Sequence, residues 1–206
     1  MSDAIPVIEV QNLQEFFRGE LQAAIERQRF AIDDHTEHYV VNVLTLFARS
    51  EALFEPTPEG RRLRPLAMML ADAVHAGSGV ERFHALQRLG DVSLFIAGFF
   101  AQSFSRRLVD VDYHIAMGGR AYDTAAGMLP GTTRGRALNS VFRELAAKFQ
   151  RLVDALNEVA ESACEKSDRD LMRLYENYVK TGSPRARDRL LKMGVQPVPA
   201  GQRQDH

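Results

Sequence analysis

The chain of 206 residues has one cysteine, no tryptophan and a formal net charge of −1. With Cys164 alone, an internal disulfide is excluded, and so is a disulfide-based secreted scaffold. Near-neutral charge leaves no general field to attract DNA or an anionic membrane. We find no basic–apolar leader pattern at the N-terminus and no apolar run of the roughly 20 residues that span a bilayer. Together these absences favour a cytoplasmic protein of bacterial type.

Common catalytic signatures are absent as well. The sequence has no G-x-S-x-G nucleophile elbow, no P-loop and no dinucleotide-binding glycine pattern. Gly118 and Gly119 fall within a helical pattern, not after a strand. At 45% hydrophobic and 26% charged residues, the composition is that of an ordinary globular protein. We therefore expect a folded protein that is not an enzyme of these classes.

Apolar residues recur at helical spacing along nearly the whole chain, with Gly and Pro between the segments. This pattern predicts an all-α bundle of about eight helices in a single domain, residues 1–194, followed by a flexible tail, 195–206. The expected helices cover residues 10–29, about 37–53, one apolar face from Leu63 to Val74, and then 80–107, 112–128, 134–165, 168–181 and 184–193.

The segment 80–107 contains the most informative stretch. From Val92 to Ala101 it is apolar at every position except Ser93. A helix that is hydrophobic on all sides must be surrounded by other helices or by lipid. Ten residues span only about 15 Å, half of a bilayer core, so lipid is excluded. We expect a buried central helix.

Two further patterns predict how the helices pack. In the segment 134–165, two interleaved series, Leu138-Phe142-Leu145-Phe149 and its continuation to Ala163, form an a/d heptad seam. Its flanking positions are mostly small or apolar, which favours an intramolecular bundle over a dimer zipper. Small residues recur every four positions in the central helix, and the segment 112–128 has a similar set, so we expect these two helices to pack closely. The two sets are Ser93, Ala97, Ala101 and Ser105, and Gly118, Ala121, Ala125 and Ala126.

The face predicted for the third helix consists of apolar residues that we expect to be buried together: Leu63, Leu66, Ala67, Leu70, Ala73 and Val74. At the start of the second helix, Asp34 and His38 are one turn apart and are possible metal ligands. The spacing of Asp34 and Glu37 favours a capping box with Asp34 as the N-cap.

Four other residues have metal-ligand spacing: Asp72, His75, Glu81 and His84. Two ligands three positions apart lie on one helical face, as in di-iron bundles. These residues lie at a helix end and a helix start, where the helix dipole favours the same residue types without a metal. A metal site here is therefore an alternative, and no additional inward-facing glutamates support it.

Asp91 precedes the apolar run, where an unpaired carboxylate is costly. The side chains that we consider as its partners are Arg88, Arg106, Tyr113, His114 and Arg120. A structural ion pair that ties helices together is one interpretation. A functional carboxylate with a shifted pKa, in a cofactor pocket formed by Asp91, Tyr113, His114 and Tyr122, is the other.

The segment Leu89-Gly90-Asp91-Val92-Ser93 resembles the distal-helix motif Leu-Gly-Asp-Leu-Ser of the haem oxygenases. The resemblance implies a haem cofactor, with Asp91 ordering water near the haem-bound oxygen. Their motif continues with Gly-Gly, whereas this chain has Leu94-Phe95. The pattern from Gly90 to Phe99 is also similar to an all-helical bacterial family of unknown function, which implies a fold but no activity.

The basic segment from Lys180 to Lys192 is a possible nucleic-acid contact, but near-zero net charge favours a solvated face. We therefore expect a non-enzymatic regulatory or partner-binding protein, with homodimerisation through an exposed helix face as one form. A haem or metal pocket near Asp91 is the first alternative, and a nucleic-acid-associated factor is the second.

Overall fold

The computed structural model describes residues 7–48, 53, 55–57, 60–100, 111–163 and 183–192. The chain divides into two compact units, Met1–Ala160 and Glu161–His206. The predicted domain of residues 1–194 extends across this division and stays a prediction, and the predicted tail lies outside the described residues. No helix within the described ranges is long and apolar enough to cross a membrane.

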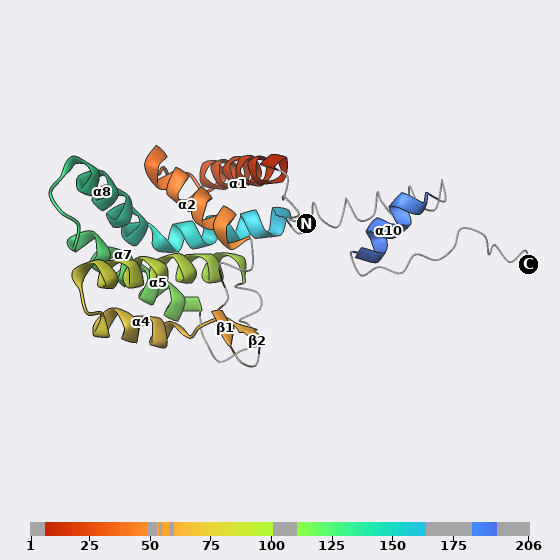
Figure 1. The fold of residues 1–206 in the computed structure, drawn as a ribbon. Helices are drawn as coiled ribbons and strands as arrows, with labels where there is room; N and C mark the ends of the chain where they lie inside the picture. Colours follow the sequence, from red (N-terminus) through yellow and green to blue (C-terminus); the bar gives the residue numbers. More distant parts are fainter. Residues whose placement is uncertain are drawn as a thin grey trace, which may run out of the picture. The chain divides into compact units, whose positions relative to one another are not determined.

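The all-α fold class is confirmed. The elements of the first unit are α1 (Val7–Arg27), α2 (Asp34–Phe47), α4 (Leu66–His75), α5 (Gly79–Phe99), α7 (Val111–Gly127), α8 (Thr133–Ala147) and a helical segment from 149, which continues to 163 (Figure 1). Between α2 and α4, the short strands β1 (Glu55–Thr57) and β2 (Gly60–Arg62) form an antiparallel hairpin that we did not predict. The second unit contains α10 (Pro184–Lys192).

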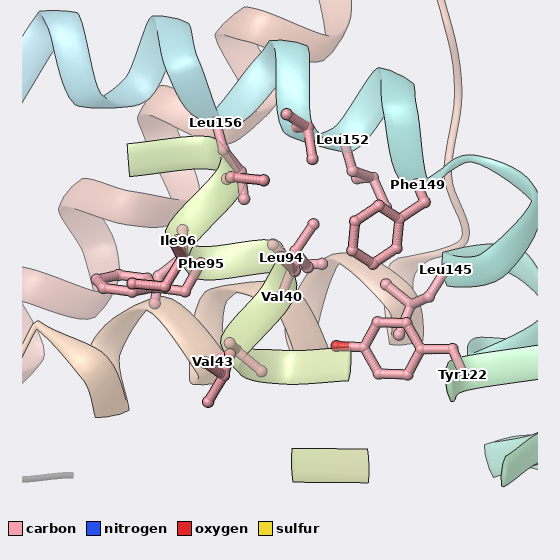
Figure 2. Packing of buried hydrophobic residues seen from close by; sticks show 14 of the residues in the cluster. Val40, Val43, Leu94, Phe95, Ile96, Tyr122, Leu145, Phe149, Leu152 and Leu156 are labelled. Atoms are coloured by element: carbon pink, nitrogen blue, oxygen red, sulfur yellow. The ribbon is translucent and has the colours of Figure 1, made fainter. Parts of the chain in front are cut away.

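Helix α5 is the buried central helix that the apolar run predicts. All seven residues from Val92 to Gly98 are buried, and Leu94 and Ala97 are 0% exposed. Figure 2 shows Leu152 and Leu156 of the segment 149–163 directed toward α5 from one side. The ring of Tyr122 approaches α5 from α7. Since neighbours cover every side of this stretch, its hydrophobic residues need no solvent face. The helix ends at Phe99, and the predicted extension 101–107 lies outside the described residues.

The close packing predicted between the two small-residue ridges is confirmed for α5 and α7. A Cβ atom added at Gly118 would overlap the ring of Phe149 and come within 2.7 Å of the Cβ of Ser93. On the same pair of helices, Gly90 lies against the ring of Tyr122, where an added Cβ would be 2.6 Å from Cε1. Residue 118 therefore faces residue 93 while residue 122 faces residue 90, so the two helices run antiparallel.

The heptad seam is buried as predicted, but the helix that carries it is not continuous. Phe142, Leu145, Leu152 and Leu156 are all 0% exposed. Helix α8 ends at Ala147, and Lys148, with φ −108° and ψ 15°, separates it from the segment 149–163. The Lys148 ammonium donates to the Ala31 carbonyl and to Glu144, both at 2.6 Å. Neither Pro nor Gly lies at this break, so the heptad pattern predicts an uninterrupted helix there.

Helix α4 corrects the prediction of its buried face. Leu66, Met69 and Ala73 are buried, whereas Leu70 is 37% and Val74 is 64% exposed. The helix is apolar on more than one side, so periodicity alone leaves its rotation undetermined. Only one of its two apolar faces packs on the core.

The N-cap of α2 is Asp33, not Asp34. The Asp33 carboxylate accepts a hydrogen bond from the His35 amide at 2.8 Å, and Asp34 is the first helical residue. A capping box needs its acid at the third helical position. Because the helix begins one residue earlier than predicted, Thr36 occupies that position, and Glu37 instead accepts a hydrogen bond from Gln22 of α1 at 2.9 Å.

Candidate functional site

Asp91 lies at the centre of a polar cluster built by three helices. The hydroxyl groups of Tyr39 on α2 and Tyr122 on α7 both donate to Oδ1 of Asp91, each at 2.7 Å. Gln87, one helical turn before Asp91, donates to the Tyr39 hydroxyl at 3.0 Å. The cluster therefore joins α2, α5 and α7 through charge-assisted hydrogen bonds, with Tyr122 buried and the other three side chains half-buried.

Glycine and aromatic residues position this cluster. Because Gly90 has no side chain, the fully buried Tyr122 ring lies directly against α5, and its hydroxyl reaches the next residue, Asp91. Phe142 of α8 packs on both tyrosines, with ring centroids 5.4 Å from each. The pair Gly90-Asp91 thus accommodates the ring of Tyr122 and accepts the hydrogen bond from its hydroxyl.

Burial dominates the electrostatics of the cluster. It raises the pKa of Asp91 to about 6, although the hydrogen bonds from Tyr122 and Tyr39 and the positive charge of Arg88 oppose this shift. Burial and the charge of Asp91 also raise the pKa of Tyr39 and of Tyr122, so both phenols remain protonated donors at neutral pH. The cluster as a whole contains one group that titrates near neutrality.

Of the predicted pocket residues, the structure brings together Asp91 and Tyr122 and places the other two elsewhere. Tyr113 and His114 lie in the first turn of α7, eight or nine residues before Tyr122, or about 12 Å along the helix. Tyr113 is 41% exposed, and His114 is buried, which lowers its pKa.

Arg88, a predicted partner of Asp91, acts on it through charge. Its guanidinium lies 4.9 Å from the centroid of the Phe47 ring. Arg120 is exposed, and Arg106 lies outside the described residues. Sequence reasoning missed Tyr39, which precedes Asp91 by 52 residues. The only local feature that could have indicated a polar contact is the position of its phenol at the edge of an apolar helical run.

The four candidate metal ligands are not gathered into one site. Asp72 pairs with Arg64 at 2.9 Å, and Nδ1 of His75 contacts the Ala71 carbonyl at 2.7 Å. Ser78 is the N-cap of α5, and its hydroxyl accepts from the Glu81 amide at 3.2 Å. The Glu81 carboxylate accepts from the amide of Gly77, the residue before this N-cap, at 3.0 Å. His84 lies beside Phe83, with ring centroids 5.4 Å apart. Among the described residues, no group of three or more His, Cys, Asp and Glu side chains is arranged to hold a metal ion.

The residues around Asp91 do not fit a haem. Leu94 and Phe95 stand where the haem oxygenase motif has Gly-Gly, and both are buried in the hydrophobic core. The space beside Gly90 is filled by the Tyr122 ring. The backbone of α5 is therefore covered by protein side chains where the resemblance implies a cofactor.

The outer face of α4 presents apolar residues to solvent. Ala67, Leu70, Ala71 and Val74 are all exposed, and their spacing of three, one and three places them in one stripe along the helix. Met68, 53% exposed, flanks the stripe, and Val80, 67% exposed, follows at the start of α5. In Figure 1, α4 lies beside α5 at the edge of the first unit. This exposed apolar stripe is the candidate interaction surface of the first unit.

Of the basic segment that we considered for nucleic-acid binding, residues 184–192 form α10 in the second unit, and residues 180–182 lie outside the described residues. Arg185 and Arg187 are exposed, with the exposed Asp188 beside them, and Leu190 is buried. This arrangement is amphipathic, and nucleic-acid binding through it stays a prediction.

Comparison of the chain with models of protein families, with curated proteins and with solved structures finds no match.

Proposed function

We propose that this chain is a non-enzymatic, protein-binding helical domain, and that the outer face of α4 binds an apolar face of a helix in another protein molecule. The main observation behind this proposal is that α4 has two apolar faces. The core covers only the face formed by Leu66, Met69 and Ala73. The exposed stripe has no charged residue, so an apolar surface is its natural complement. Helices commonly bind other helices through residues at spacings of three and four.

The polar cluster at Asp91 supports a structural role and not a reaction site. Its carboxylate already accepts two hydrogen bonds from side chains, and Tyr122 is 0% exposed. A group that acts on a substrate has to reach it, whereas the hydroxyls of Tyr39 and Tyr122 are both directed at the Asp91 carboxylate. The cluster therefore fits a device that specifies how three helices pack.

Site-specific photo-crosslinking in cells tests the proposal. A photoreactive amino acid is placed at position 74 on α4 and, as a control, at the exposed position 151, away from the stripe. We expect a discrete adduct, identified by mass spectrometry, at position 74 and none at position 151. Equal labelling at both positions, or none at either, contradicts the proposed function.

A further inference from the structure

The exposed stripe of α4 alternates in side-chain size. Along the helix its members are Ala67, Leu70, Ala71 and Val74, so small and large residues follow one another. Helix faces pack well when the bulky residues of one helix enter spaces beside small residues of the other. The stripe therefore carries both the protrusions and the spaces that a matching surface needs.

This alternation is complementary to itself in only one direction. When two copies of α4 pair antiparallel about an axis between residues 70 and 71, Ala67 faces Val74 of the other copy and Leu70 faces Ala71. Every contact then joins a large and a small side chain. In a parallel pair, Leu70 faces Leu70 and Ala67 faces Ala67, which gives crowding at one level and a gap at the next.

The charges of α4 also suit a contact between identical surfaces. In this antiparallel pairing, position 72 of one copy lies opposite position 69 of the other, so Asp72 does not face its own equivalent. Asp72, the one acidic residue of α4, is paired with Arg64, with Nη1 and Oδ2 2.9 Å apart. His75 contacts the backbone of its own helix through Nδ1. No unbalanced charge on α4 opposes a second copy.

We propose that the partner helix is α4 of a second copy of this chain, in an antiparallel two-fold dimer. This inference depends on the proposed function and deepens it. Helix α4 has ten residues, or about 15 Å of length, so the contact is small beside the roughly 800 Å² that each partner contributes to a standard interface. We therefore expect a weak, reversible dimer.

Sedimentation of the full-length protein over a concentration series tests the dimer. We expect concentration-dependent dimerisation that Val74→Asp weakens by more than about tenfold, because it places an unpaired carboxylate in the contact. Leu46→Asp is the matched control, since Leu46 is an exposed apolar residue of α2 and is 51% exposed. It leaves dimerisation unchanged. Equal effects of the two variants overturn the inference.

Cysteine cross-linking tests the antiparallel register. In a background with Cys164→Ser, Ala67→Cys and Val74→Cys are each oxidised alone and as a mixture. Antiparallel pairing brings position 67 of one copy to position 74 of the other, while two copies of position 67 lie about 10 Å apart, too far for a disulfide. We expect a disulfide-linked dimer only in the mixture, and a dimer from either variant alone overturns the register.

The outcomes separate this inference from the proposed function. A chain that stays monomeric at all concentrations, and that cross-links through position 74 to a different protein, overturns the homodimer and supports protein binding. A monomeric chain without any adduct at position 74 overturns both. A self-adduct at position 74 together with reversible dimers supports both.

Discussion

Helices α4 and α5 are neighbours of nearly opposite character, although both are rich in apolar residues. In α5, every residue from Val92 to Gly98 is covered by surrounding helices. In α4, the core covers one face, and a second apolar face is open to solvent. The apolar residues of α5 are therefore enclosed by other helices, whereas those on the outer face of α4 are exposed. The two helices differ in how many elements pack around them.

The two helices also differ in how they accommodate polar groups. The interior helix includes Asp91, whose carboxylate is stabilised by hydroxyl donors from two other helices. The outer stripe has no ionisable residue at all. Buried polar networks specify one arrangement of a core, whereas an uncharged exposed stripe accepts another apolar surface. The comparison thus links specificity of folding to α5 and supports the binding role proposed for α4.

Adjacent glycines of α7 give the strongest test of how tightly α5 is enclosed. We expect Gly118→Ala to lower the free energy of unfolding by about 2–3 kcal/mol, because its Cβ would overlap Phe149 and Ser93. Gly119→Ala is the control, since its Cβ would lie 3.7 Å from the nearest atom. It gains about 0.5–1 kcal/mol from helix propensity. Urea unfolding measures both, and a loss of the same size at position 119 contradicts close packing as the cause.

Removing one hydroxyl from the Asp91 cluster tests whether it stabilises the enclosed helix. Tyr122→Phe deletes a donor to the carboxylate, and hydrogen bonds to charged groups contribute about 1.5–3 kcal/mol. We expect a loss of about 2 kcal/mol at pH 8, measured by urea unfolding. Tyr113→Phe, at an exposed position of the same helix, changes stability by less than about 0.5 kcal/mol. Similar losses in both variants exclude a special role for the cluster.

The pH dependence of stability tests the burial of Asp91. Burial raises the pKa of Asp91 in the folded state from 3.8 to about 6. Protonation of Asp91 therefore stabilises the folded state by about 3 kcal/mol below pH 3.8, and this stabilisation is lost as the pH rises through 6. Between pH 8 and pH 5 we expect the wild type to gain about 1 kcal/mol relative to Asp91→Asn.

The comparison with Asp91→Asn also controls for other titrating groups. Burial lowers the pKa of His114, which acts in the opposite direction over part of this pH range, but it does so in both proteins. The difference between the two unfolding curves therefore isolates Asp91. A difference that does not vary with pH contradicts the buried carboxylate.

Sequence periodicity correctly predicts which residues of a helix are buried where the apolar residues allow only one orientation of that helix. The run from Val92 to Gly98 has no polar side to turn outward, and the heptad series has only one apolar seam. Helix α4 has apolar residues on several sides, and we therefore predicted Leu70 and Val74 in the core, where the structure does not place them. The rotation of such a helix depends on which neighbours are present.

The candidate site was predictable only in part for a related reason. An Asp beside an apolar run needs a partner, and that need is visible in the sequence. Which partner it finds depends on the relative position of distant helices. Tyr39 is brought to Asp91 by the packing of α2 on α5, and no local pattern encodes that contact. The spacing of Glu81 and His84, by contrast, suggested metal ligands, but local hydrogen bonds at the start of α5 account for Glu81.

The smallest expected effect completes the comparison between the two helices. At concentrations where the chain is monomeric, we expect Val74→Asp to change the free energy of unfolding by less than about 0.5 kcal/mol, because Val74 is 64% exposed. The same substitution at Val92, 1% exposed, places an unpaired carboxylate in the core and costs more than about 4 kcal/mol. Thermal unfolding of both variants measures the contrast. If Val74→Asp is strongly destabilising in the monomer, the outer face of α4 is part of the folded core, and it is not available to bind a second copy.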